Sequence, residues 1–469
     1  MSKEKLPKGV IGISLILVLG VLPPMLDATI VNIAINDLAK LFSVSFSIIQ
    51  WVVTGYTLAL GIAVPFSGWL MLKFDGKKIF MSALGLFLIA SLLSGFAWDI
   101  QSLIAFRILQ GFASGLLIPT LTTMVVQSAG AENLGRLMSI IGIPIVFGPI
   151  VGPIIGGLIM RHLTWHWLFF VNLPIGIIAL LLMQWKLPKF EATGTDAKMD
   201  WPGILLLGLT SGLFIYGVTK IKGSTGSAAG ILAVVLGAAS MAAYILYAGR
   251  KKEKALIPLK MFRSKNFSAA FISLFLAGFA TNGPMLLFPM FFQNVRGLDV
   301  ITSALWLIPQ GAGMLLTRSL VGKMTDRIGA RFVVLPSIAI TIIGTLPFVF
   351  FDMGSSQWLI WIVLLLRGIG VGGVTVPVMS DSYVGLEKNQ VAQASVSTRI
   401  IQNIGAAFGS AILATVVSNS IAGKAATAGI ISGAYHAGFI TSLIFMVIGI
   451  LPALFLTNKL GKRAAGKAS

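Results

Sequence analysis

The chain has 469 residues, of which 56% are hydrophobic and 11% are charged, and this excludes a soluble domain, in which about 25% of residues are charged. The net charge of +20 does not predict a nucleic-acid partner, because the basic residues lie in short segments between apolar runs, as in the loops of membrane proteins. The sequence has no cysteine, so disulfides, thiolate metal sites and cysteine catalysis are excluded.

Fourteen apolar segments are long enough to cross a bilayer, which takes about 20 residues in a helix. The sequence therefore predicts an all-α integral membrane protein with fourteen spans. The basic N-terminus leads into the first of these without a cleavage site, so we expect that span to be retained. The predicted spans are 10–36, 47–72, 79–97, 100–126, 134–160, 166–186, 201–219, 226–248, 267–292, 300–321, 330–350, 357–380, 393–418 and 436–458.

The distribution of Lys and Arg predicts the orientation. An even number of spans places both termini on one side. With cytoplasmic termini, about 25 of the 35 Lys and Arg residues lie in cytoplasmic segments, so we predict that both termini are cytoplasmic. The most basic of these segments is 249–266. All loops are short and contain no phosphate-binding G-x-x-x-x-G-K-[ST] loop, so ATP is not the expected energy source. We expect no cofactor.

An internal repeat indicates duplicated halves. The segment S-G-W-L-M-L-K-F-D-G-K-K that contains Gly68 resembles V-G-K-M-T-D-R-I-G-A-R, which contains Gly322, and F-R-I-L-Q-G with Arg107 resembles L-R-G-I-G with Arg367. Both pairs are offset by about eight spans, which is typical of transporters built from repeats. We predict a six-helix bundle at 1–190, a two-helix insert at 191–255 and a second six-helix bundle at 256–469.

The first span contains the acidic residue Asp27, about 25 Å along a helix that rises 1.5 Å per residue. Acidic side chains within spans are costly and tend to face functional cavities, so Asp27 is a candidate for proton coupling; the alternative is solvation at the outer surface. In the fourth span, Arg107 needs an acceptor if it is buried; the alternative is extension to the interface. Gln110 and Gly111 follow it, and the glycine allows close helix packing.

The fifth span has glycines every four residues on one face, at Gly148, Gly152 and Gly156, with Pro149 and Pro153 between them. Such a face allows intimate helix packing, and the prolines remove backbone donors and bend the helix. Ordinary packing is the alternative to a role in closing and separating two bundles.

Polar and aromatic residues within the spans are candidates for lining a substrate cavity, although lipid or core contact is the alternative for each aromatic side chain. A large apolar cavity with few polar groups favours amphipathic substrates. The candidates are Gln50, Trp51, Tyr56, Asn282, Phe288, Phe291, Gln293, Gln310, Gln402 and Asn403. His162 and His166 have helical spacing but no third ligand, so we predict no metal site.

Four motifs resemble one family. L-D-A-T-I-V-N-I-A (26–34), R-I-L-Q-G (107–111), G-P-I-V-G-P-I-I-G-G (148–157) and W-H-W-L-F-F-V-N-L-P-I-G (165–176) resemble the motifs of the major facilitator superfamily, specifically its fourteen-span drug:proton antiporters of the EmrB/QacA type. The resemblance covers nearly the whole chain and implies the major facilitator fold, with two six-helix bundles and two additional central helices.

The resemblance implies a role for each motif. Asp27 would couple protons to substrate, and Arg107 would link protonation to conformational change. The glycine–proline face from Gly148 to Gly157 would seal the interface between the halves. The loops after spans 2 and 10 would latch the cytoplasmic side; they contain Gly68, Lys73 and Asp75, and Gly322, Asp326 and Arg327.

The sequence departs from the family pattern at three places. The acid expected four residues after Gly68 is Leu72, with Asp75 three residues later. The proline expected after the first motif is Asn36. The arginine expected in span 13 is Gln402, with Arg399 one turn earlier.

The resemblance and the residues together predict a proton-driven exporter of amphipathic compounds, cationic ones among the candidates. It would be a monomer in a bacterial plasma membrane, with protons, small substrates and membrane lipid as partners. Export of a physiological lipid, fatty acid or metabolite is one alternative. An ion channel is another, which saturable flux abolished by an uncoupler would exclude. An intramembrane enzyme is a further alternative, but the sequence lacks the clustered nucleophile and base that such an enzyme would need. The sequence does not indicate whether a periplasmic adaptor is needed.

Overall fold

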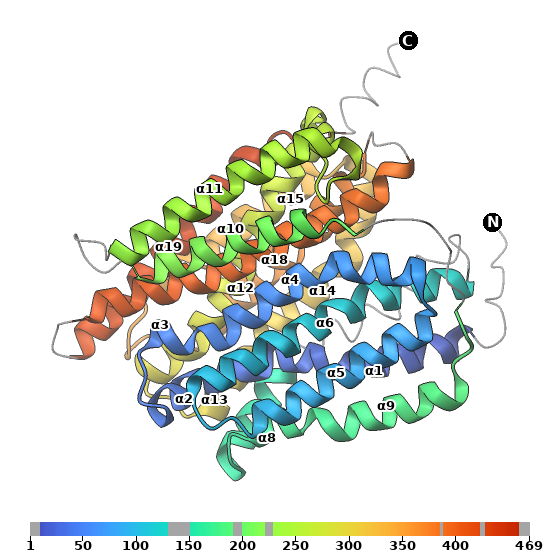
Figure 1. Cartoon of the computed structure of the whole chain (residues 1–469). Coiled ribbons are helices and arrows are strands. Elements are labelled where there is room, and N and C mark those ends of the chain that lie inside the picture. The colour runs from blue at the N-terminus through green and yellow to red at the C-terminus, as the bar shows by residue number, and fades with distance from the viewer. Residues whose placement is uncertain are drawn as a thin grey trace. The chain divides into compact units, whose positions relative to one another are not determined.

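The computed structural model describes residues 10–129, 151–190, 199–220, 228–384, 388–422 and 427–458. Within these ranges the structure is helical and contains no strand (Figure 1). The helices form two compact units. The first consists of the described residues of Met1–Phe42 and Gly55–Met199, and the second of those of Ser43–Thr54 and Asp200–Ser469.

Thirteen helices in the described ranges are long and apolar enough to cross a membrane. They confirm thirteen of the predicted spans, within the uncertainty of helix ends. The predicted fifth span, 134–160, lies partly outside the described residues, and its described part from 151 onward is helical to residue 162. Several spans contain prolines within the helix. Neighbouring helices in a membrane bundle can satisfy the backbone groups that such a proline leaves without a partner.

The first unit is a bundle whose core is formed by α1, α4, α5, α6 and α9. The helices are α1 (Val10–Ile30), η1 (Val31–Ala34), α2 (Ile35–Leu41), α4 (Trp51–Lys73, with its first four residues in the other unit), α5 (Gly76–Gly95), α6 (Ile100–Ala129), 151–162, α8 (Trp167–Phe170) and α9 (Asn172–Lys186). Side chains such as Phe80, Phe87 and Met183 are fully buried between them.

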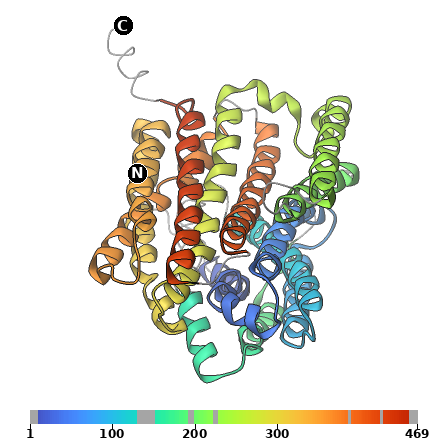
Figure 2. The same cartoon turned by 90° about the vertical axis from the view of Figure 1, so that its left-hand side faces the viewer.

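The second unit contains the remaining helices. They are α3 (Phe46–Ile49), α10 (Trp201–Lys220), α11 (Ala228–Lys251), η3 (Lys252–Lys254), η4 (Leu259–Arg263), α12 (Lys265–Asn294), α13 (Val300–Leu305), α14 (Ile308–Ile328), α15 (Arg331–Ile343), η5 (Leu346–Val349), α16 (Gln357–Gly372), α17 (Thr375–Asp381), α18 (Lys388–Ile421) and α19 (Ala428–Ala453). Helices α10 and α11 run side by side as a pair (Figures 1 and 2). The predicted domain boundaries stay predictions.

Close contacts at glycines show how the first unit is assembled. A Cβ at Gly111 would lie 2.2 Å from the Tyr56 carbonyl oxygen, and one at Gly115 would lie 2.2 Å from that of Leu60. Only a residue without a side chain lets the backbones of α4 and α6 approach so closely.

The second unit repeats this contact between α14 and α16. A Cβ at Gly368 would lie 2.0 Å from the Gln310 carbonyl oxygen, and one at Gly372 would lie 3.1 Å from that of Met314. Gln310 and Met314 each follow their α4 counterparts by 254 residues, as Gly322 follows Gly68, whereas the two glycines follow theirs by 257.

This register corrects one expectation from the sequence. We expected Arg367 to be the counterpart of Arg107, but the glycine contacts make Gln110 its counterpart, because these two residues are 257 positions apart. The two motifs look alike because each contains an arginine close to a packing glycine. The arginine precedes that glycine by four residues in α6 and by one in α16.

Candidate functional site

Asp27 lies in α1, within the apolar core of the first unit, and has no exposed surface. Its Oδ2 accepts a hydrogen bond from Nη1 of Arg107, which is 1% exposed and lies in α6. A buried ion pair is stable only when its charges are well paired and hydrogen-bonded. The sequence prediction that a buried Arg107 needs an acceptor is therefore met by the carboxylate of Asp27.

The other oxygen of Asp27 is also held. Nδ2 of Asn172, the first residue of α9, lies 3.0 Å from Asp27 Oδ1 and 2.9 Å from Oγ of Ser91 in α5. Ser91 donates its own proton to the Phe169 carbonyl oxygen at 2.9 Å. The carboxylate thus accepts one bond from a cation and one from a neutral amide.

Gln110 closes the network into a ring. Its Oε1 accepts from Arg107 Nη1 at 2.8 Å, and its Nε2 donates to Ser91 Oγ at 3.0 Å. Asp27, Arg107, Gln110, Ser91 and Asn172 therefore form a cyclic set of hydrogen bonds, called here the five-residue ring. All five side chains are buried, and they come from α1, α5, α6 and α9.

The aromatic ring of Tyr56 covers the guanidinium of Arg107, whose Cζ lies 4.1 Å from the ring centroid. The Tyr56 hydroxyl lies 2.7 Å from Ser114 Oγ and donates to the Pro24 carbonyl oxygen at 3.2 Å. A cation on an aromatic face is stabilised further when it is desolvated. Tyr56 therefore holds the charge in place and braces α4 against α1 and α6.

The described part of the glycine face packs on α1 beside Asp27. A Cβ at Gly152 would lie 2.1 Å from Thr29 Oγ1, and one at Gly156 would lie 2.7 Å from the Ile30 carbonyl oxygen. Pro153 and Gly157 are buried in the same helix, whereas Gly148 and Pro149 lie outside the described residues. These contacts are within the first unit, and the predicted sealing of the halves stays a prediction.

The five-residue ring can take up one proton at Asp27, and this would break the ion pair between Asp27 and Arg107. Protonation of Asp27 would remove the negative charge that compensates Arg107 and leave a buried cation without its counter-charge, which is strongly unfavourable. Uptake of a proton by Asp27 would therefore require other acceptors for Arg107.

The second unit has a buried arginine without a described carboxylate partner. Arg367 is fully buried in α16; its Nη2 donates to the Ala280 carbonyl oxygen at 2.9 Å, and its Cζ lies 4.8 Å from the Phe288 ring centroid. Among the described residues, its Nε and Nη1 atoms have no hydrogen-bond partner. The buried arginine of the first unit is therefore paired with a carboxylate, whereas that of the second unit donates to a backbone carbonyl oxygen.

The sequence matches the family model of the Major Facilitator Superfamily over residues 17–410. The chain belongs to this superfamily. It is thus an integral membrane transporter, and this family and fold indicate a transporter rather than an enzyme.

Relatives within the superfamily include drug-resistance proteins. The chain is 29% identical over 419 residues to a multidrug resistance protein B homolog of Mycobacterium tuberculosis, covering 88% of this chain and 77% of the relative. It is 27% identical over 443 residues to the lincomycin resistance protein LmrB of Listeria monocytogenes, covering 92% of this chain and 93% of the relative.

Solved structures of the superfamily share the fold. A bacterial homolog of the human lysosomal transporter Spinster, in an inward-facing and occupied conformation, aligns with a TM-score of 0.70 at 13% identity, covering 96% of this chain and 97% of that chain. A D-xylose-proton symporter aligns with a TM-score of 0.69 at 16% identity, covering 95% and 97%. At these identities the likeness confirms the predicted fold class alone.

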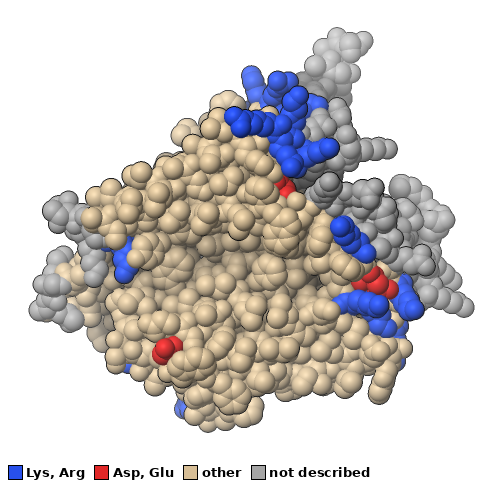
Figure 3. All heavy atoms as spheres, viewed as in Figure 1, with Lys and Arg blue, Asp and Glu red and all other residues tan. Residues whose placement is uncertain are grey.

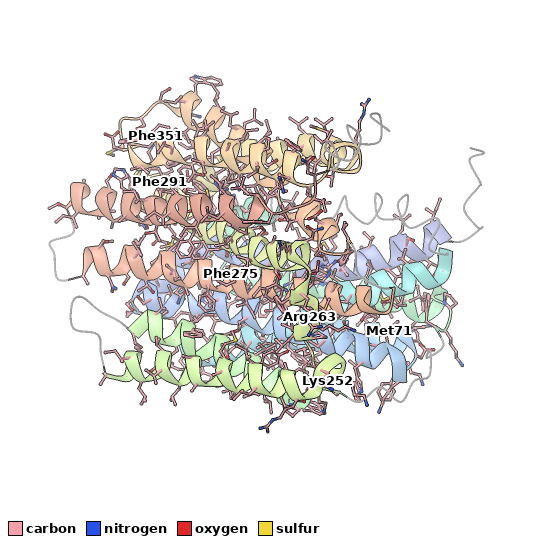
Figure 4. The ribbon with its side chains drawn as sticks, turned by 90° about the horizontal axis from the view of Figure 1, so that it is seen from above. Met71, Lys252, Arg263, Phe275, Phe291 and Phe351 are labelled. Atoms are coloured by element: carbon pink, nitrogen blue, oxygen red, sulfur yellow. The ribbon has the colours of Figure 1, made fainter. Side chains whose placement is uncertain are left out.

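The predicted substrate-binding residues lie in both units. Tyr56 belongs to the first unit and contacts Arg107. In the second, Gln50 is buried and accepts from the Thr54 hydroxyl at 2.8 Å. Phe288 and Phe291 are fully buried in an aromatic cluster with Phe348 and others, and Figure 4 labels Phe291 within it.

The other candidates for substrate binding are less enclosed or only partly described. Gln310 is 4% exposed, and its Oε1 has no partner among the described residues. Trp51, Gln293, Gln402 and Asn403 are half-buried, and the side chain of Asn282 lies outside what the structure describes. Their binding role stays a prediction.

Of the predicted latch residues, Lys73, Asp75 and Arg327 lie at helix ends, whereas Gly68 and Gly322 lie within helices and not in the expected loops. Lys73 ends α4 with its Nζ 5.0 Å from the Trp69 ring centroid, and Asp75 caps α5 by accepting from the Lys78 backbone N–H at 3.2 Å. Gly68 and Gly322 lie within α4 and α14, and Arg327 is exposed at the end of α14. The side chains of Leu72, four residues after Gly68, and of Asp326 lie outside what the structure describes.

Sequence reasoning missed three functional or structural polar residues. Asn172 and Ser91 complete the ring; Asn172 lies in the motif at 165–176, whereas the signal for Ser91 was a polar side chain within an apolar run. Asp381 directly follows the predicted span 357–380, a position for which the sequence predicts a solvated carboxylate, but it is 2% exposed and accepts bonds from the Thr457 backbone N–H at 3.0 Å and from the Thr457 hydroxyl. That expectation was wrong because Asp381 ties α17 to the chain after α19.

Proposed function

We propose that the chain is a proton-driven exporter of amphipathic compounds in a bacterial plasma membrane. The observation that carries this proposal is the five-residue ring, in which a titratable carboxylate is paired with a guanidinium in the core of a span bundle. The names of the relatives, a multidrug resistance protein and a lincomycin resistance protein, support drugs as the exported compounds.

In the proposed cycle, Asp27 is ionised and paired with Arg107 when substrate binds from the cytoplasm. A proton from outside neutralises Asp27, and Arg107 must then find other acceptors, which shifts α1 and α6 and favours substrate release outward. Loss of the proton to the cytoplasm restores the ion pair. The proton gradient is the energy source, so no cofactor takes part, and we expect the protein to work as a monomer.

The test is dye efflux from cells that express the wild type or Asp27→Asn. The asparagine keeps the size and hydrogen-bonding capacity of the side chain but cannot exchange a proton. We expect efflux to fall at least about tenfold, since proton-transfer groups typically contribute factors of 10² or more. Asp37→Asn, in the partly exposed α2, is the matched control and should retain efflux. Normal uncoupler-sensitive efflux by Asp27→Asn would contradict the proposal.

A second candidate substrate class is favoured by Arg367. A buried guanidinium cannot be neutralised by deprotonation, and two of its nitrogens lack partners among the described residues. An anionic amphiphile such as a fatty acid would supply the missing acceptor. This candidate keeps proton-coupled export and changes the cargo.

Proteoliposomes separate the two classes. We expect Arg367→Gln to lower the flux of a fatty acid by about tenfold or more, as loss of a hydrogen bond to a charged group predicts, and to leave the flux of a cationic dye within about twofold. Equal loss of both fluxes would assign Arg367 a structural role. Unchanged fatty-acid flux would eliminate the second candidate.

A further inference from the structure

A dense group of cations lies where α11 ends in the second unit. Residues 250–263 carry six basic side chains and a single acidic one, Glu253. All six basic side chains are exposed, and they are Arg250, Lys251, Lys252, Lys254, Lys260 and Arg263. Figure 3 shows Lys and Arg gathered at this end of the α10–α11 pair. We call this segment the basic platform.

The basic platform is folded and anchored. Asp200 anchors the platform through two hydrogen bonds. Its Oδ2 accepts from the Leu256 backbone N–H at 2.7 Å, and its Oδ1 accepts from the Tyr247 hydroxyl. The Tyr244 hydroxyl accepts from the Ile257 backbone N–H at 2.8 Å. Because these bonds fix the backbone to α11 and to Asp200, the residue directly before α10, the cations are presented in a defined arrangement.

Within the platform, apolar and basic side chains point in opposite directions. Ala255, Ile257 and Met261 are buried beneath it, while the cations face outward. Lys252 has a positive φ of 55°, which turns the chain between α11 and the following segment. The helices η3 and η4, to which the labelled Lys252 and Arg263 belong, pack against each other (Figure 4).

The helices that carry the platform are exposed along their length. Leu232, Leu236, Ile245 and Leu246 of α11 are between 47% and 69% exposed, and only 22% of the apolar stretch of α11 is buried. In a membrane protein such side chains face lipid. The cations at the end of α11 therefore lie at the level of the lipid headgroups, where Lys and Arg side chains extend into the interface.

We propose that the basic platform binds the headgroups of anionic phospholipids. Clusters of four to eight basic residues next to a span attract anionic lipid, and here six are fixed in one place beside a lipid-facing helix. The positive-inside pattern alone requires the charges but not their anchoring by Asp200 and Tyr244. This proposal goes beyond the proposed export function and does not depend on it.

The experiment is native mass spectrometry of the full-length protein in detergent with equal amounts of phosphatidylglycerol and phosphatidylcholine of the same acyl chains. We expect the wild type to retain phosphatidylglycerol with a preference of about five- to tenfold. The platform variant Lys252→Gln/Lys254→Gln/Arg263→Gln should reduce the preference to below about twofold, and added salt should do the same because it screens exposed charges.

The control variant removes the same number of exposed charges elsewhere, as Lys78→Gln/Lys186→Gln/Lys189→Gln, and should keep the wild-type preference. Thermal unfolding of both variants in detergent checks that each is folded. An unchanged preference in the platform variant would overturn the proposal, as would equal loss in the control variant. Binding of soluble polyglutamate to the wild type, with no phosphatidylglycerol preference, would replace the lipid by an acidic protein and also overturn it.

Discussion

At the scale of single residues, the carboxylate of Asp27 is controlled by neutral neighbours as well as by Arg107. Asn172 and Ser91 hold the side of the ring opposite to the guanidinium. A hydrogen bond donated to an ionised carboxylate favours its charged form. Asn172 is therefore expected to tune the pH at which Asp27 exchanges its proton, without itself carrying the proton.

Replacement of Asn172 tests this. Asn172→Leu removes the donor to Asp27, and we expect the pH of half-maximal transport to rise by about one unit, because such a bond is worth about 1.5 kcal/mol or more. The direction follows from the loss of a group that favours the ionised form. The measurement is the pH profile of transport in proteoliposomes with buffered inner and outer pH.

Two serines of α5 supply a matched control for the same effect. Ser91→Ala should shift the profile in the same direction as Asn172→Leu but by less. Ser94 is also fully buried, and its hydroxyl has no partner among the described residues, so Ser94→Ala should leave the profile unchanged. Identical profiles for the two serine variants would exclude the ring as the source of the shift.

At the scale of helices, the position of Arg107 depends on the close approach of α4 and α6. Gly111 lies one turn after Arg107 and allows Tyr56 to lie over the guanidinium. A methyl group at Gly111 would meet the Tyr56 carbonyl oxygen at 2.2 Å, and the two helices would have to separate.

Gly111→Ala should therefore lower both stability and transport. Forced overpacking typically costs about 1–3 kcal/mol, which would be seen as a lower midpoint of thermal unfolding in detergent. Gly85→Ala on α5 is the control, since nothing lies within 4 Å of its added Cβ, and alanine is favoured over glycine in a helix interior by about 0.5–1 kcal/mol. A Gly111→Ala protein at least as stable as Gly85→Ala would contradict the packing account.

At the scale of the whole molecule, the spans followed from hydropathy because a bilayer requires about 20 apolar residues in each helix. The resemblance to the superfamily could be recognised from sequence because each of its motifs is a continuous stretch of the chain. Contacts between helices were not predictable in this way. Ser91 and Asn172 meet Asp27 only because α5 and α9 pack beside α1, and no local pattern specifies that contact.

The alignment of the internal repeat could also be predicted only in part from the sequence. Gly68 and Gly322 could be matched from sequence because both lie in long, similar segments, and their offset of 254 residues equals that between Tyr56 and Gln310, whose carbonyl oxygens face Gly111 and Gly368. Arg107 and Arg367 were mismatched by three residues, because a short motif with one arginine and several glycines fits more than one register. Only the backbone contacts of Gly111 and Gly368 resolve it.

The central claim is that one buried carboxylate couples protons to substrate. The most direct measurement is simultaneous proton and dye flux in proteoliposomes under an imposed pH gradient, for the wild type and Asp27→Asn. We expect dye movement to drive proton movement in the opposite direction in the wild type and neither flux to depend on the other in the variant. Dye-driven proton flux that persists in Asp27→Asn would contradict the account.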